Sequence, residues 1–148
     1  MALDPSLVGR SYPPTEPYPV GREKIREFAT AVGLTDPEHH DPAAARARGY
    51  ADVIAPPTFP VVLTLATDRL SVGDPELGLD YSRVVHGDQR FAYTRPIVAG
   101  DELVAVHTVE EIVSRGGHDF LTMRTDVTDA AGEPVVSLWS KLVVRGEG

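Results

Sequence analysis

The segment TFPVVLTLATDRLSVG, residues 58–73, places apolar side chains around nearly the whole circumference of the helix that it can form. Thr58 can cap this helix, Pro60 suits its first turn, and Gly73 ends it. The apolar positions inside it are Val61, Val62, Leu63, Leu65, Ala66 and Leu70. A helix that is apolar on most sides is stable only when other elements cover it. The segment therefore predicts a long helix, starting near Thr58, that the rest of the chain must enclose.

The C-terminal half contains the predicted strands that can cover this helix. Residues 90–95 alternate in polarity, and three longer stretches with strand character follow at 102–113, 119–128 and 135–144. The turn segments SRGG and DAAGEP between them contain the glycine that hairpin turns favour. The side chains that share a face in the last two stretches are Leu121, Met123, Thr125 and Val127, and Val136, Leu138, Ser140, Leu142 and Val144. This order predicts an antiparallel meander curled around one helix, which is an α+β fold.

The remaining elements are shorter. Residues 1–20 are rich in proline and are expected to be extended, and residues 22–32 predict a half-buried helix. Its apolar stripe consists of Ile25, Phe28, Ala29 and Val32. The pairs Gly87-Asp88 and Gly100-Asp101 predict turns between strands.

Size and composition exclude several classes of protein. The 148 residues fit one domain, residues 1–148, and a formal net charge of -8 opposes nucleic-acid binding, which needs a cationic surface. There is no cysteine for a disulfide or thiolate metal site, and no phosphate-binding loop for a nucleotide. No secretory signal and no apolar run of roughly 20 residues, the length that crosses a bilayer, is visible. We therefore expect a cytoplasmic protein without a cofactor, whose partners include neither nucleic acid nor membrane.

The most polar stretch, residues 33–49, contains Glu38, His39, His40 and Asp41 in succession. Adjacent residues on an extended chain point to opposite sides, so the two histidines are poorly placed to share one ion, and no metal site is predicted. His39 is expected to be a solvated loop histidine. A role as acid or base stays open, because such a role needs a carboxylate partner. The segment PAAARARG after Asp41 can form a short helical turn.

Four stretches together carry a family pattern. They are VGREKIREFATAVG (20–33), DVIAPPTF (52–59), LDYSRVVHGDQRFAYTRPIVAGDEL (79–103) and VVSLWSKLVVR (135–145). These stretches resemble the MaoC-like hot-dog dehydratases and hydratases, in particular the small actinobacterial (3R)-hydroxyacyl-ACP dehydratase subunits and the FAS1-type dehydratase N-terminal domains. The resemblance covers nearly the whole chain. It implies a single hot-dog domain, in which a curved antiparallel sheet wraps around a long central helix.

In active members of that family, an Asp-x-Asn-Pro-x-His motif supplies the Asp and His that hold water and move protons during reversible hydration of a trans-2-enoyl thioester. The motif falls on residues 34–39, LTDPEH, so the proline and histidine match while Leu34 replaces the catalytic Asp. Active members also use the N–H of a glycine at the position of Pro57 to polarise the thioester carbonyl, and proline has no N–H. The resemblance therefore implies that two parts of the catalytic site are missing.

Such a deficit resembles the division of labour in heterodimers of the family, where one hot dog carries the Asp/His site and the other contributes the tunnel for the acyl tail. The resemblance implies an acyl-chain-binding subunit of a (3R)-hydroxyacyl-thioester dehydratase, which works with a catalytic MaoC-like partner on acyl-ACP or acyl-CoA in fatty-acid or polyketide biosynthesis. Long edge strands also favour a dimer, with that partner or with itself. No catalytic residue is assigned, and the candidates are His39 and Asp36. The substrate-binding candidates are Pro57, Thr58, Phe59, Val62, His86 and Gly87.

Alternatives stay open at this point. A self-sufficient homodimeric (R)-specific enoyl-thioester hydratase would use Asp36 and His39 in an altered arrangement, and a non-catalytic thioester-binding scaffold would show no turnover. His86 is also compatible with a plain turn beside Gly87. Val62, like Phe59, is compatible with a packed core, because periodicity does not separate a core from a tunnel wall.

Overall fold

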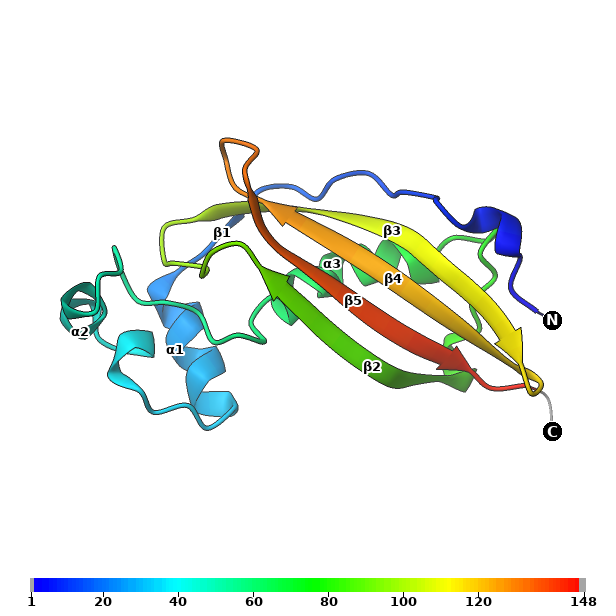
Figure 1. Cartoon of the computed structure of the whole chain (residues 1–148), viewed down its shortest axis with the longest axis horizontal. Coiled ribbons are helices and arrows are strands. Elements are labelled where there is room, and N and C mark those ends of the chain that lie inside the picture. Colours follow the sequence, from blue (N-terminus) through cyan, green and yellow to red (C-terminus); the bar gives the residue numbers. More distant parts are fainter. Residues whose placement is uncertain (1, 147–148) are drawn as a thin grey trace.

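The computed structural model describes residues 2–146. Its centre is a five-stranded antiparallel sheet in the order β1-β3-β4-β5-β2, curled around helix α3 (Figure 1). The strands are β1 (Tyr18–Pro19), β2 (Val84–Tyr93), β3 (Glu102–Arg115), β4 (His118–Thr128) and β5 (Pro134–Val144). The helices are α1 (Arg22–Ala31), α2 (Pro42–Ala47) and α3 (Val61–Val72), with 3-10 turns at Pro5–Leu7, Pro37–His39 and Tyr81–Arg83. The predicted α+β hot-dog architecture is confirmed.

The meander of β3, β4 and β5 follows directly from the sequence pattern. β4 alternates between buried and more exposed side chains along its whole length, as a strand with one covered face must. Gly116 and Gly117 turn the chain from β3 into β4 with φ angles of 61° and 78°, a left-handed conformation that glycine adopts without strain. The three strands therefore form one continuous curved surface.

The helix α3 is covered on one side only, which corrects the expectation of an enclosed helix. Its buried residues are Leu63, Thr64, Thr67 and Ser71. Leu65 keeps 67% of its surface exposed and Leu70 keeps 39%. Three of the four side chains that face the sheet are small and polar, so much of the apolar surface of the helix points outward instead.

The ends of α3 also differ in part from the prediction. The helix begins at Val61 rather than near Thr58, and no side chain caps its start. Thr58 instead accepts a 3.2 Å hydrogen bond from the N–H of Val61 with its backbone carbonyl, in the turn before the helix. Gly73 ends the helix as predicted, and its N–H donates to the carbonyl of Arg69.

The N-terminal segment covers one edge of the sheet, because it runs along the outer side of β3 (Figure 1). The N–H groups of Tyr12 and Thr15 donate to the carbonyls of His107 and Ala105 at 2.8 and 3.0 Å. Much of residues 2–20 is extended, as expected, apart from a single 3-10 turn. The opposite edge strand, β2, pairs with β5 on one side and has no strand on its other side among residues 2–146, so it is the open edge of the sheet.

Strand β2 starts at Val84, earlier than the predicted 90–95. Gly87 and Asp88 lie inside the strand, where its register with β5 shifts, so they form a β-bulge and the predicted turn is wrong. Glycine suits the bulge because a Cβ at Gly87 would lie 3.1 Å from a methyl group of Val143. The bulge decides which side chains of β2 face the helix.

The segment between β1 and α3 forms a lobe beyond one end of the sheet (Figure 1). Ile25 and Ala29 of α1 are fully buried there, whereas Val32 is 49% exposed, so the predicted stripe stops one turn early. The short helix predicted after Asp41 is confirmed as α2. This lobe holds the histidine-containing stretch.

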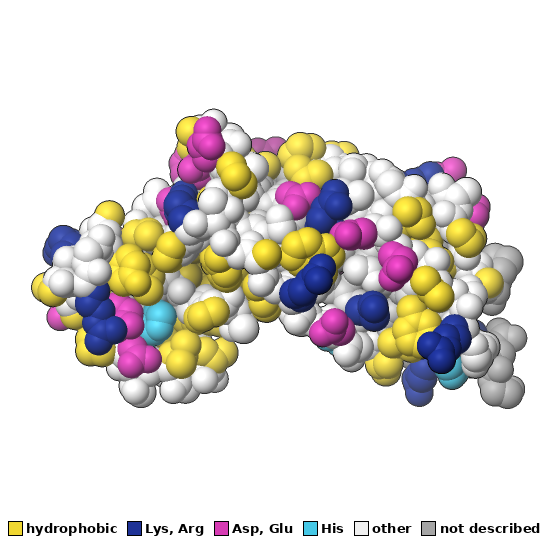
Figure 2. All heavy atoms as spheres, viewed as in Figure 1, with side chains coloured by type: hydrophobic (Ala, Val, Ile, Leu, Met, Phe, Trp, Pro, Cys, Tyr) yellow, Lys and Arg dark blue, Asp and Glu magenta, His cyan; other side chains and the backbone are white. Residues whose placement is uncertain are grey.

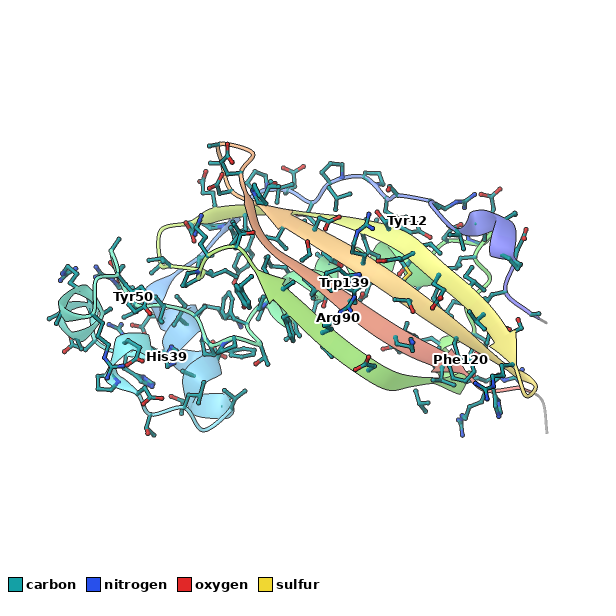
Figure 3. The ribbon with its side chains drawn as sticks, in the orientation of Figure 1. Tyr12, His39, Tyr50, Arg90, Phe120 and Trp139 are labelled. Atoms are coloured by element: carbon teal, nitrogen blue, oxygen red, sulfur yellow. The ribbon has the colours of Figure 1, made fainter. Side chains whose placement is uncertain are left out.

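The convex face of the sheet carries charged and apolar side chains in close alternation (Figure 2). Arg90 stacks over Trp139, with its guanidinium carbon 4.1 Å from the ring centre, and the indole N–H donates to Glu110 at 2.6 Å (Figure 3). Trp139 is therefore part of a mixed, polar sheet surface. No helix within residues 2–146 has the length and apolar character to span a membrane.

Candidate functional site

His39 is buried, with 6% of its surface exposed, so the expectation of a solvated histidine is wrong. Its Nδ1 lies 2.7 Å from the backbone carbonyl oxygen of Ile54. A carbonyl only accepts, so Nδ1 carries the proton of the neutral ring and Nε2 is left as an acceptor. The N–H of Ile54 in turn donates to the carbonyl of Glu38 at 3.0 Å. These two contacts with Ile54 hold the polar loop against the lobe (Figure 3).

The neighbours of His39 hold other parts of the loop. Nε2 of His40 lies 2.8 Å from the carbonyl of Leu34, and Asp41 caps α2 by accepting a 2.9 Å hydrogen bond from the N–H of Ala43. Each side chain therefore stabilises a different backbone segment. Within residues 2–146, no group of three His, Asp or Glu side chains converges as a metal site would require.

A cavity of about 430 Å³ adjoins His39, and we name it the histidine cavity. Its lining residues are Glu38, His39, Ile54, Ala55, Pro57, Tyr93, Thr94, Arg95 and Pro96. Asp36, the predicted carboxylate partner, is exposed and is not part of this lining. The carboxylate that lines the cavity belongs to Glu38: one oxygen pairs with Arg48 at 2.9 Å, and the other is buried without a partner among residues 2–146.

The predicted oxyanion position also lies at this cavity. Pro57 lines it without an N–H to offer, and its carbonyl accepts a 2.6 Å hydrogen bond from the hydroxyl of Tyr93. Burial raises the pKa of Tyr93, so the phenol stays protonated and keeps donating to Pro57. The next two candidates differ in burial. Thr58 is exposed, whereas Phe59 is fully buried, with its ring edge-on to that of Phe28 and the ring centres 5.5 Å apart. Phe59 is therefore a core residue.

Val62 and His86 belong to a second hollow of about 430 Å³ between α3 and strands β2 and β5, which we name the helix groove. Gly87, in contrast, packs against Lys141 and Val143 and does not line the groove. Of the six predicted binding residues, one lines the histidine cavity, two line the helix groove, and the other three line neither. His39 and Pro57 meet at the histidine cavity.

A row of polar side chains crosses the floor of the helix groove. Ser140 donates a 2.9 Å hydrogen bond to the side-chain oxygen of Gln89, which also lies 3.0 Å from Nε2 of His86. The side-chain nitrogen of Gln89 is buried and has no partner among residues 2–146. On the helix side, Asp68 and Ser71 line the same groove. We name these five residues the polar band.

His107 continues the polar band under the helix. Its Nδ1 lies 2.8 Å from the hydroxyl of Thr125, while Nε2 lies 3.5 Å from the hydroxyl of Ser71 and 3.7 Å from the carboxylate of Asp68. A nucleophilic triad needs its serine and its carboxylate on different imidazole nitrogens, so this is no Ser-His-Asp arrangement. Burial lowers the pKa of His107 to about 4 and raises that of Asp68 to about 6.

Sequence reasoning missed most of the polar band. One signal was present: Ser140 stands among apolar side chains on a face that the strand period assigns to the core, as does Thr125, the partner of His107. Asp68 and Gln89 gave no comparable signal. Asp68 lies in a helix whose buried side was not evident, and Gln89 faces inward only because of the bulge at Gly87.

Solved structures define the class of protein. A MaoC-like dehydratase superposes with a TM-score of 0.88 and 37% identity over 95% of this chain, which spans only 43% of that chain. A chain of the C-terminally truncated HadBC (3R-hydroxyacyl-ACP dehydratase) complex from Mycobacterium tuberculosis superposes with a TM-score of 0.82 and 32% identity, over 93% of this chain and 96% of that one. The fold is that of a MaoC-like hot-dog domain.

Sequence comparison then gives the family. The model of the FAS1-like dehydratase domain region matches residues 6–138. The UPF0336 protein of Streptomyces avermitilis is 62% identical over 145 residues, covering 98% of this chain and 97% of that protein. The UPF0336 protein of Thermobifida fusca is 49% identical over 147 residues, covering 99% and 97%. The chain belongs to the FAS1-like dehydratase domain family, and the predicted resemblance is confirmed.

Proposed function

We propose that the chain is the acyl-chain-binding subunit of a (3R)-hydroxyacyl-thioester dehydratase, completed by a catalytic MaoC-like partner. The observation that carries this proposal is the composition of the histidine cavity. His39 is positioned there, but Leu34 stands where the family has its catalytic Asp, and Pro57 has no N–H for the thioester oxyanion. A lone chain then lacks both water activation and one oxyanion donor. The acyl group would arrive on ACP or CoA, in cytoplasmic fatty-acid or polyketide biosynthesis.

Two features of the surface support a partner. Strand β2 is an open sheet edge, and open edges pair readily with another strand. Two large apolar side chains are exposed near this edge. Leu65, on the outer face of α3, keeps 67% of its surface exposed, and Tyr81, in the 3-10 turn before β2, keeps 64%. The solved chain that superposes at 32% identity comes from a two-component dehydratase complex, HadBC, which is the type of assembly that we propose here.

The test is reconstitution. The chain is purified alone, then mixed with a MaoC-like protein of the same genome that carries the intact Asp-x-Asn-Pro-x-His motif, and hydration of enoyl-CoA substrates is followed. We expect no turnover from the chain alone and turnover from the mixture, with a gain on longer enoyl chains over the partner by itself. A mixture that is no more active than the partner would contradict the subunit role and favour the scaffold alternative.

A second candidate is a self-sufficient hydratase, and one observation favours it. The buried, unpaired oxygen of Glu38 lies in a side chain that lines the same cavity as His39. Glu38 could therefore hold a water for His39, in place of the predicted Asp36, which does not line the cavity. Turnover by the lone chain that both Glu38→Gln and His39→Ala abolish would support this candidate. An unchanged background rate in both variants would remove it.

A further inference from the structure

A row of polar side chains, which shares Ser140 and Ser71 with the polar band, separates the two clusters of the hydrophobic core. On one side of it lies the cluster that contains Leu138 and Val127, and on the other side lies the cluster that contains Leu121 and Met123. Between them stand Ser140, Thr125 and His107 on the sheet, and Thr67 and Ser71 on the helix. Polar groups inside a core lower stability unless they are hydrogen-bonded. All five of these side chains are hydrogen-bonded within the chain, so the row makes the middle of the core polar but is itself paired.

Gln89, next to this row, gives the sign of a ligand. Its oxygen is engaged by Ser140 at 2.9 Å and lies 3.0 Å from His86, yet its buried nitrogen has no partner among residues 2–146. If the oxygen and nitrogen of the amide were exchanged, the oxygen would be the buried atom without a hydrogen-bond partner. A buried amide group without a partner is costly, so an unpaired one beside a groove indicates a site for a hydrogen-bonding atom of a ligand.

The groove on either side of the polar band is apolar. Towards the start of α3 it is lined by Phe28, Val62 and Leu65, and towards the end of α3 by Val72, Val84 and Leu142. Its volume of about 430 Å³ falls within the range of small-molecule sites. A ligand that matches this lining has hydrocarbon at both ends and an oxygen between them.

We propose that the helix groove binds an acyl chain that carries a hydroxyl or keto oxygen within its hydrocarbon, with that oxygen held by Gln89 and Asp68. This inference rests on the acyl-binding function proposed above and adds the class of chain. The amide N–H of Gln89 donates to the ligand oxygen. The Asp68 carboxyl, half of whose side chain remains exposed to the groove, accepts from a hydroxyl when ionised and donates to a carbonyl when protonated.

The charge state of Asp68 suits both kinds of oxygen. Burial raises the pKa of its carboxyl to about 6, an effect that His86 partly opposes, so both protonation states are accessible near neutral pH. His86 also faces the groove from β2, and His107 lies beneath Asp68 on β3. A plain alkyl chain would leave the Gln89 donor unpaired and would cover the Asp68 carboxyl without a hydrogen bond.

The experiment is a hydroxyl scan by calorimetric titration of the purified chain. The probes are N-acetylcysteamine thioesters of decanoic acid, unsubstituted or with one hydroxyl at successive carbons along the chain. We expect one hydroxyl position to bind at least about threefold more tightly than the plain chain, the gain of one net hydrogen bond. The variant Gln89→Leu should lose this preference while still binding the plain chain.

Thr122→Val is the matched control, because it also removes a buried, unpaired polar atom of the sheet but lies outside the groove. It should keep the preference for the hydroxylated chain. Equal affinity for plain and hydroxylated chains would overturn this inference, with water rather than a ligand oxygen satisfying Gln89, and would leave the acyl-binding function standing. Absence of binding by every chain would overturn both.

Discussion

Nδ1 of His39 and the backbone carbonyl of Ile54 are 2.7 Å apart, although the two residues are separated by fifteen positions. This contact fixes the imidazole in the lobe. We expect His39→Ala to lower the free energy of unfolding by about 1–3 kcal/mol, because the partly buried Ile54 carbonyl loses its partner. Urea denaturation measures the change. The control His118→Ala, at an exposed hairpin position, should stay within about 0.5 kcal/mol of the wild type. Equal losses in the two variants would contradict this role.

Truncating a side chain on one face of α3 should mainly affect stability, and truncating one on the other face should mainly affect partner binding. Leu63 is 4% exposed and Leu65 is 67% exposed, two residues apart on the same helix. Leu63→Ala should cost about 2–5 kcal/mol of stability, since it removes buried methyl groups. Leu65→Ala should cost less than about 0.5 kcal/mol in the lone chain and weaken its binding to the proposed partner. Denaturation curves, together with titration of the partner, separate the two effects.

Two threonines three positions apart on β4 give a second matched pair. The hydroxyl of Thr122 is buried without a partner among residues 2–146, whereas that of Thr125 lies 2.8 Å from Nδ1 of His107. Replacing Thr122 by Val removes an unpaired polar atom and should raise stability by about 1 kcal/mol. Thr125→Val removes a partner of a buried imidazole and should lower stability by about 1–3 kcal/mol. Changes of the same sign would show that the Thr122 hydroxyl is satisfied.

The opposed shifts of Asp68 and His107 predict a pH dependence. The pKa of Asp68 is raised from 3.8 to about 6, so between these values the native state binds more protons and stability falls as pH rises. The pKa of His107 is lowered from 6.5 to about 4, so between these values the unfolded state binds more protons and stability falls as pH decreases. The two trends oppose each other in the shared window.

Removing the Asp68 carboxyl should reveal the pH dependence of stability that His107 causes. Asp68→Asn leaves only the His107 contribution, so the stability of this variant should decrease more steeply than that of the wild type as pH is lowered from 6.5 towards 4. Chemical denaturation at several pH values across that window measures both slopes. Parallel curves for the variant and the wild type would show that Asp68 titrates in the native state as it does in the unfolded chain.

Much of the architecture follows from periodicity, because the covered face of the sheet imposes a period of two on long strands. Leu121, Met123, Thr125 and Val127 face the core as the pattern predicts. The same reasoning failed for α3. Apolar residues around a whole helix do not tell which side packs, and here Thr64 and Thr67 face the sheet while Leu65 points outward. An exposed apolar helix face has the same hydropathy in the sequence as a buried one.

The site was less predictable, because long-range contacts place it. Burial of His39 depends on Ile54, and no local pattern around the histidines signals that contact. The bulge at Gly87 shifts the inward face of β2 from Asp88 to Gln89, which a strict alternation cannot anticipate. The family motif singled out His39 and Pro57, which both line the histidine cavity, yet it did not indicate Glu38, the carboxylate in that lining.

The most direct test of the central claim is the hydration of crotonyl-CoA by the purified chain alone. With an aliphatic side chain at position 34 and a proline at position 57, we predict a rate equal to that of buffer, and activity only after a partner with an intact Asp/His motif is added. Turnover by the chain alone, lost on substitution of His39 by alanine, would contradict the account.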